Sequence, residues 1–99
     1  MKTTIEKEKL YIDILKVMVH YASIALSVER QTTFWDEIYT FSKRNIFMSR
    51  CAFRHDRLEK LSKMVNHNIS EVIEITEDEY DLIYNLKSKE VLWKEMFGY

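Results

Sequence analysis

The chain contains no proline, and its single glycine is the penultimate residue, Gly98. Tight turns depend on residues that fix φ or tolerate positive φ, so this shortage disfavours a β-barrel or a β-sandwich. The single cysteine, Cys51, excludes an intramolecular disulfide bond. Because an unpaired cysteine suits a reducing compartment, we expect a cytoplasmic protein.

The shortage of glycine also removes whole classes of enzyme. Loops that cradle phosphates need glycines so that backbone amides can approach the ligand, and the pattern Gly-x-Ser-x-Gly of serine hydrolases is absent as well. The Glu-x-x-His pairs of di-iron helix bundles are also missing. The positions three residues before His20, His55 and His67 hold Val17, Ala52 and Met64. We therefore expect a non-enzymatic protein with no catalytic residue, no cofactor and no metal site.

Polar residues in the first third of the chain recur at alternating spacings of three and four, which places them on one side of a helix. We call them the polar stripe: Glu6, Lys9, Asp13, Lys16, His20, Ser23, Ser27 and Arg30. Nearly every other residue between Leu10 and Val28 is apolar. A helix that is apolar over most of its circumference must be covered, so the pattern indicates burial and self-association.

This first helix is predicted to run from Thr3, where Thr3–Glu6 has the form of a capping box, to about Arg30. Its apolar window carries Asp13, Lys16 and His20, and charged residues at the centre of a membrane span are costly. We therefore expect no contact with a membrane.

The remaining chain also has mainly helical spacing. A second helix is predicted from Thr33, with a bend or an end at Ser42–Asn45, and a third from Ile46 to Val65, ended by the cluster Asn66–Asn68. Residues 71–75 are the one place where a short strand competes with a helix, because they are rich in β-branched residues. Such a strand needs a partner, which another subunit could supply.

Thr76–Glu79 forms a second capping box, which should open one final helix carrying residues 80–97. With 99 residues, the chain is long enough for one domain. The predicted fold is therefore mainly α, a bundle of about four helices spanning residues 1–99. Two Trp, six Tyr and five Phe are more aromatics than such a bundle readily hides. We expect a homo-oligomer, with a dimer as the first choice, and a protein partner.

Four cations form the candidate binding site, and we call them the basic face: Lys43, Arg50, Arg54 and Arg57. On a helix, their spacings of seven, four and three place them within a ~60° sector. Arginine side chains suit phosphate or carboxylate partners. Three alternatives follow: contact with the acidic run of residues 71–81 in the same fold, binding to an acidic protein, and binding to a nucleic acid. Trp93 and Phe97, close to the C-terminus, are the candidate aromatic interface.

One remote alternative rests on a resemblance. The doublet His55-Asp56, with His20 upstream and Asp78 or Asp81 downstream, resembles the ligand order of helical HD-type metal phosphohydrolases, although Arg54 and Arg57 flank it where that family usually has apolar or small residues. The resemblance implies metal-dependent phosphoester hydrolysis.

The leading interpretation is a small interaction protein that binds a host or viral macromolecule. In its size and its lack of motifs, the chain looks like accessory proteins of phages or archaeal viruses, which would place it in the host cytoplasm.

Overall fold

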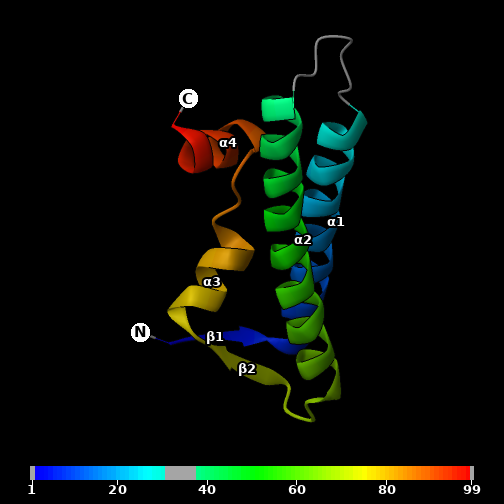
Figure 1. The fold of residues 1–99 in the computed structure, drawn as a ribbon. Coiled ribbons are helices and arrows are strands. Elements are labelled where there is room, and N and C mark those ends of the chain that lie inside the picture. The colour runs from blue at the N-terminus through cyan, green and yellow to red at the C-terminus, as the bar shows by residue number, and fades with distance from the viewer. Residues whose placement is uncertain (1, 31–37, 99) are drawn as a thin grey trace.

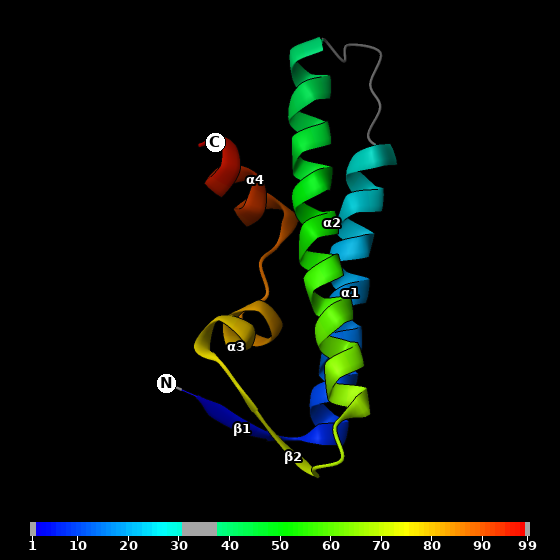
Figure 2. The same cartoon turned by 60° about the horizontal axis from the view of Figure 1, so that its bottom comes forward.

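The computed structural model describes residues 2–30 and 38–98. The elements follow in the order β1 (Thr3–Glu6), α1 (Lys7–Arg30), α2 (Ile38–His67), β2 (Val72–Ile75), α3 (Glu77–Tyr84) and α4 (Lys89–Phe97). Helices α1 and α2 form a long antiparallel hairpin, with the two strands at one end and α3 and α4 along one side (Figures 1 and 2). The protein measures 52 × 23 × 15 Å along its principal axes, and it is elongated because α2 is 30 residues long. The predicted mainly α fold of about four helices with a short strand is confirmed.

The hairpin is held together by a buried seam. The apolar side chains of α1 alternate at spacings of four and three, and those of α2 follow the same pattern except at one position, which Arg54 occupies. Helix α1 contributes Leu10, Ile14, Val17, Tyr21, Ile24 and Val28. Helix α2 contributes Phe47, Cys51, Leu58, Leu61 and Val65. This spacing keeps one side of each helix facing the other over several turns, as in a coiled coil. On α1 this seam covers only one side of the apolar circumference that the sequence pattern predicted to be buried, since Ile12, Leu15 and Val19 remain exposed.

The strand expected near residues 71–75 is present, and its partner lies in the same chain. β1 pairs with β2 in antiparallel register, with Thr3 opposite Ile75 and Ile5 opposite Ile73. The predicted helix start at Thr3 was wrong, because Thr3–Glu6 form this strand and the helix begins at Lys7. The alternating pattern of β1 turns Ile5 toward the core, and pairing satisfies backbone groups that β2 would otherwise leave open.

Helix α2 is longer than the sequence suggested. The bend or end predicted at Ser42–Asn45 was wrong, because these residues lie inside one continuous helix of 30 residues. No proline or glycine interrupts it, and the seam residue Phe47 follows one turn later, so packing carries the helix through this polar stretch. The predicted start at Thr33 lies outside the described residues. The predicted end at Asn66–Asn68 is confirmed, since α2 finishes at His67.

The final helix was also predicted incorrectly, because it consists of two helices. The capping box at Thr76 is confirmed: the Thr76 hydroxyl accepts from the Glu79 amide, and the Glu79 carboxylate accepts from the Thr76 amide. Helix α3 then ends before Asn85, and Ser88 opens α4 by accepting from the Val91 amide at 3.2 Å. The break lets α4 change direction and bury Leu92. Gly98 closes α4 at φ 80°, a conformation that suits glycine.

The polar stripe of α1 holds this C-terminal arm, which we define as residues 76–98. The Tyr84 hydroxyl donates to the Asp13 carboxylate at 2.7 Å, and a ring nitrogen of His20 lies 2.8 Å from the Lys87 carbonyl oxygen. Seven residues further along α1, the Ser27 hydroxyl oxygen accepts a hydrogen bond from the Lys89 ammonium at 3.4 Å. These three stripe residues are spaced seven apart, so the arm follows α1 along its length. His20 is thus a hydrogen-bonded structural histidine.

Two pKa values change at the first of these contacts. The hydrogen bond from Lys9 lowers the pKa of Asp13 below its ordinary value of 3.8, against the opposing effect of burial, and the Tyr84 hydroxyl lowers it further. Burial raises the pKa of Tyr84 above its ordinary value of 10.0, and the hydrogen bond to Asp13 adds to this effect.

Helix α1 has the length and apolar composition of a membrane span over Lys7–Val28, and it is the one described helix that does. In this fold its seam packs against α2, and its polar side chains bind the C-terminal arm. These contacts support a soluble protein.

Two matched Tyr→Phe substitutions should differ in their effect on stability. Tyr84→Phe removes a hydrogen bond to a carboxylate and should lower the free energy of unfolding by about 1–2 kcal/mol. The Tyr21 hydroxyl is buried without a hydrogen-bond partner in the described part of the chain, so Tyr21→Phe should be neutral or stabilising by up to about 1 kcal/mol. Urea unfolding followed by circular dichroism measures both. A larger loss of unfolding free energy for Tyr21→Phe than for Tyr84→Phe would contradict the view that Tyr84 is hydrogen-bonded and Tyr21 is not.

The cost of Tyr84→Phe should also depend on pH. Asp13 has a lowered pKa, so its contribution is present above pH 3.8 and is lost as the pH falls through its folded-state value. Tyr84 has a raised pKa, so its contribution is present below pH 10.0 and is lost as the pH rises further. We expect the difference between wild type and Tyr84→Phe to form a plateau between these limits and to shrink on both sides. A difference that does not shrink as the pH falls below 3.8 would contradict the role of Asp13.

Candidate functional site

The basic face lies on one uninterrupted helix, α2, which gives Lys43, Arg50, Arg54 and Arg57 the common side that their spacing predicts. Their environments differ, however. Arg50 and Arg57 are exposed, whereas Lys43 and Arg54 are half-buried. The four cations therefore do not act as one uniform patch.

The two half-buried cations are engaged by aromatic rings of the same chain. The Arg54 guanidinium lies 5.5 Å from the ring centroid of Tyr21 in the seam, and the Lys43 ammonium lies 5.2 Å from that of Phe97 on α4. At these distances the negative face of a ring attracts a cation. Arg54 and Lys43 thus help to pack α2 against α1 and α4.

The two exposed arginines lie beside apolar side chains that are also exposed. Ile46 is 52% exposed and Phe53 is 62% exposed, on either side of Arg50 along α2. The Arg57 guanidinium lies 6.0 Å from the Phe53 ring centroid. We call Ile46, Arg50, Phe53 and Arg57 the binding face. Sequence reasoning did not propose Ile46 and Phe53. The available signal was that neither residue shares the helical spacing of Phe47, Cys51 and Leu58.

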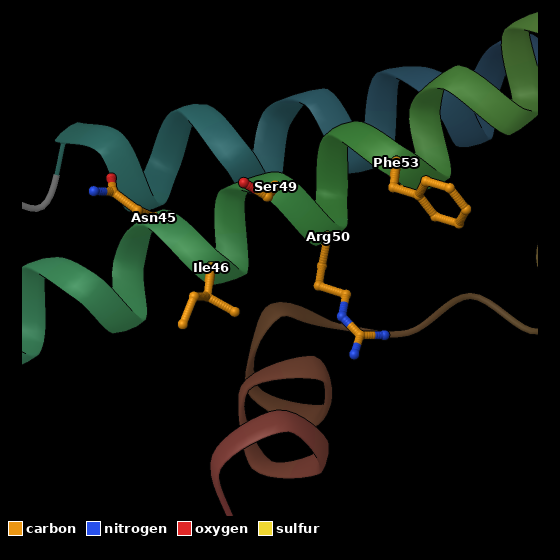
Figure 3. A pocket seen from close by; sticks show the side chains of 5 residues that line it. All are labelled: Asn45, Ile46, Ser49, Arg50 and Phe53. Atoms are coloured by element: carbon orange, nitrogen blue, oxygen red, sulfur yellow. The ribbon is translucent and has the colours of Figure 1, made fainter.

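Two adjoining hollows border the binding face. One, of about 350 Å³, lies between α2 and α4, and its lining includes Arg54, Leu92, Glu95, Met96 and Phe97. The other, of about 330 Å³, runs along α2 past Asn45, Ser49 and Phe53. Ile46 and Arg50 line both, and Figure 3 shows the two side chains on the side of α2 where α4 lies. The hollows therefore form one groove with apolar side chains and arginines along α2, and with Glu95, which is paired with Lys87 at 3.0 Å, on the α4 side.

The candidate aromatic interface, Trp93 and Phe97, lies on the side of α4 that packs against α2. Trp93 lies 5.3 Å from Phe47 and 4.7 Å from Phe97, measured between ring centroids, and both Trp93 and Phe97 are half-buried. Their contacts within the chain attach α4 to the seam.

The acidic run does not neutralise the arginines. No ion pair joins Arg50, Arg54 or Arg57 to residues 71–81 among the residues that the structure describes. Instead, Glu79 caps α3 and Asp81 accepts a hydrogen bond from Asn85. The exposed arginines keep their capacity to bind a carboxylate or a phosphate.

The ligands that the HD-type resemblance implied do not meet in the described residues. The group that comes together is His55, Asp56 and Glu59, whose ligand atoms lie within 4.8 Å of one another on α2. His20 instead lies against the Lys87 carbonyl, and Asp78 and Asp81 belong to α3.

The His55 group is a weak metal site by its chemistry. The Lys63 ammonium already lies 3.4 Å from the Glu59 carboxylate, and Asp56 is exposed. All three side chains come from two turns of one helix, which leaves the rest of a coordination sphere to water. Cys51 does not add to it, since burial raises the pKa of its thiol and keeps it protonated.

No family model, no curated protein and no solved structure matches the chain.

Two arginine substitutions on α2 should differ in their effect on the free energy of unfolding. Arg54→Ala removes the contact with Tyr21 and should lower the free energy of unfolding by about 1 kcal/mol. Arg50→Ala, one turn away and exposed, should change it by less than about 0.5 kcal/mol. Chemical denaturation of both variants in one buffer provides the measurement. Equal losses of unfolding free energy in the two variants would show that the contact of Arg54 with Tyr21 does not stabilise the fold.

Proposed function

We propose that this chain is a non-enzymatic interaction protein that binds an acidic, partly apolar segment of another protein through the binding face of α2. The observation that carries this proposal is the exposure of Ile46 and Phe53 on either side of Arg50. In the described structure Arg50 takes part in no ion pair, and its guanidinium borders the groove between α2 and α4.

The chemistry of the groove supports a partner that is both acidic and apolar. Arg50 and Arg57 offer planar donors that match a carboxylate, and binding would cover the exposed Ile46 and Phe53. Leu92 and Met96 extend the apolar wall onto α4. A helix or an extended segment with carboxylates beside apolar side chains would satisfy both parts of this surface.

A nucleic acid is the alternative partner. The Phe53 ring beside Arg57 favours it, since proteins that bind single strands combine aromatic rings with cations. The formal net charge of −1 and the acidic run at residues 71–81 oppose it, because nucleic-acid binders usually carry a basic field. The balance of charge therefore favours a protein partner.

The place of action that we propose is the cytoplasm. Cys51 is 1% exposed, and its thiol is protonated and buried in the seam. Masking a macromolecule there is a role that suits a small accessory protein of a virus.

A random peptide library displayed on phage tests the proposed partner chemistry. Selection on the immobilised protein should enrich peptides in which Asp or Glu neighbours Leu, Phe or Trp. Arg50→Glu should lose at least 10-fold in affinity for the enriched peptides, because it places a carboxylate opposite their own. Lys63→Glu makes the same change of charge on another side of α2 and should lose much less. Failure to enrich acidic peptides, or equal losses in the two variants, would contradict the proposal.

Oligonucleotides provide the second arm of the test. Titration with single-stranded and duplex DNA at two salt concentrations should show no tight binding. Tight binding that weakens steeply with salt, and that Arg50→Glu abolishes, would favour the nucleic-acid alternative, since the salt dependence reports counterions displaced from phosphates.

A further inference from the structure

Helix α1 has a second apolar side that no described element covers. We call it the outer stripe: Ile12, Leu15, Val19, Ala22 and Leu26. The four large side chains are 50%, 39%, 65% and 49% exposed in that order. At 100° per residue the stripe lies about 180° around the helix from the buried seam. The core therefore uses one apolar side of α1 and leaves the other in water.

The remaining circumference of α1 is already occupied. The polar stripe binds the C-terminal arm, and Tyr11, Met18 and Ala25 pack against the edge of the core. The outer stripe is thus a bounded strip about 21 Å long, at 1.5 Å per residue. Contiguous apolar surface of this kind on a soluble protein usually marks an interface.

We propose that the outer stripe docks against the outer stripe of a second copy of this chain, with the two α1 helices antiparallel. The stripe repeats at spacings of three and four, which is the spacing by which α1 packs against α2. Two helices whose apolar side chains have the same spacing can pack against each other. A second copy of the chain, related by a two-fold axis, carries an identical stripe and therefore has this spacing. Ala22 near the middle allows the helices to approach closely.

Charge selects the orientation. The position one turn before Ile12 in the stripe is Glu8, which is exposed. A parallel pair would place the two Glu8 carboxylates opposite each other, and like charges at such a position are destabilising. An antiparallel pair centred on Val19 separates them by about 33 Å along the helix axis. Between Ile12 and Leu26 the stripe itself carries no charge, so nothing else opposes the contact.

The area of the stripe sets the strength of the dimer. Each copy offers on the order of 400 Å² of exposed apolar surface, so a pair with its flanking side chains buries roughly 800–1,200 Å² in total, at the lower limit of stable interfaces. We therefore infer a dimer that dissociates on dilution in the micromolar range. This proposal is independent of the proposed function, because α1 and α2 carry the two surfaces separately.

Sedimentation across a dilution series tests the dimer directly. The average mass of the wild type should fall from twice the 12.0 kDa of one chain toward that value on dilution. Val19→Glu should be monomeric throughout, because it buries two carboxylates against each other. Val19 is 65% exposed, so the fold should survive, and circular dichroism verifies this. Met64→Glu, at a residue 68% exposed on α2, which packs on the opposite side of α1 from the outer stripe, should dimerise like the wild type.

Two results would overturn the dimer. One is a wild type that remains monomeric up to millimolar concentration. The other is a folded Val19→Glu that still dimerises like the wild type.

A distance measurement tests the orientation. Lys9→Cys carries one spin label beside Glu8 and leaves the Glu8 carboxylate in place, and Cys51 is buried. Pulsed electron paramagnetic resonance on the dimer should give a label separation above about 28 Å, as the antiparallel arrangement requires. A separation below about 22 Å would show a parallel pair and overturn the proposed orientation.

Vesicles test the competing occupant, a lipid surface. Flotation with phosphatidylcholine vesicles, with and without phosphatidylglycerol, should leave the wild-type protein in solution. Vesicle binding by a protein that is monomeric in solution, abolished by Val19→Glu, would assign the outer stripe to lipid and overturn the proposal.

Discussion

The packing of α1 against α2 is the interaction on which the other parts of this fold depend. Its apolar side chains alternate at spacings of four and three from Leu10 to Val28 on α1, and on α2 they keep this pattern from Phe47 to Val65 except at Arg54. Because the helices are antiparallel, the start of α1 meets the end of α2. That meeting brings Thr3 opposite Ile75 and makes a two-stranded sheet from segments far apart in the sequence. The sheet in turn sets where α3 begins.

The candidate binding surface is a consequence of polar contacts made by a different helix. Asp13 and His20 of α1 hold Tyr84 and Lys87, and so guide the C-terminal arm back along the hairpin. Helix α4 then lies across α2, with its Leu92 buried and the groove open beside Arg50. A loss of these contacts would weaken the attachment of α4, which Leu92 and Trp93 also hold against α2, and would loosen one wall of the groove. The stability of the arm and the shape of the surface are therefore coupled.

The two proposed surfaces differ in chemistry and lie on separate helices. The binding face of α2 combines arginines with exposed apolar side chains, whereas the outer stripe of α1 is uncharged between Ile12 and Leu26. A second copy docked on α1 would leave α2 accessible. Such a dimer would present two binding faces, and a partner with two matching segments would bind it more tightly than either face alone through effective concentration.

The sequence by itself determined those features that arise within about four residues: the capping box at Thr76, the end of α2 near His67 and the helical spacing of both long helices. Only the tertiary structure decided that Thr3–Glu6 form a strand, since the partner strand lies about seventy residues away. It likewise carried α2 through Ser42–Asn45, yet broke the final helix at Asn85, because local propensities there were similar and long-range burial differed. Spacing placed four cations on one side of a helix. Contacts with Tyr21 and Phe97 then divided them into two that pack and two that stay exposed, since a ring's position depends on the whole fold.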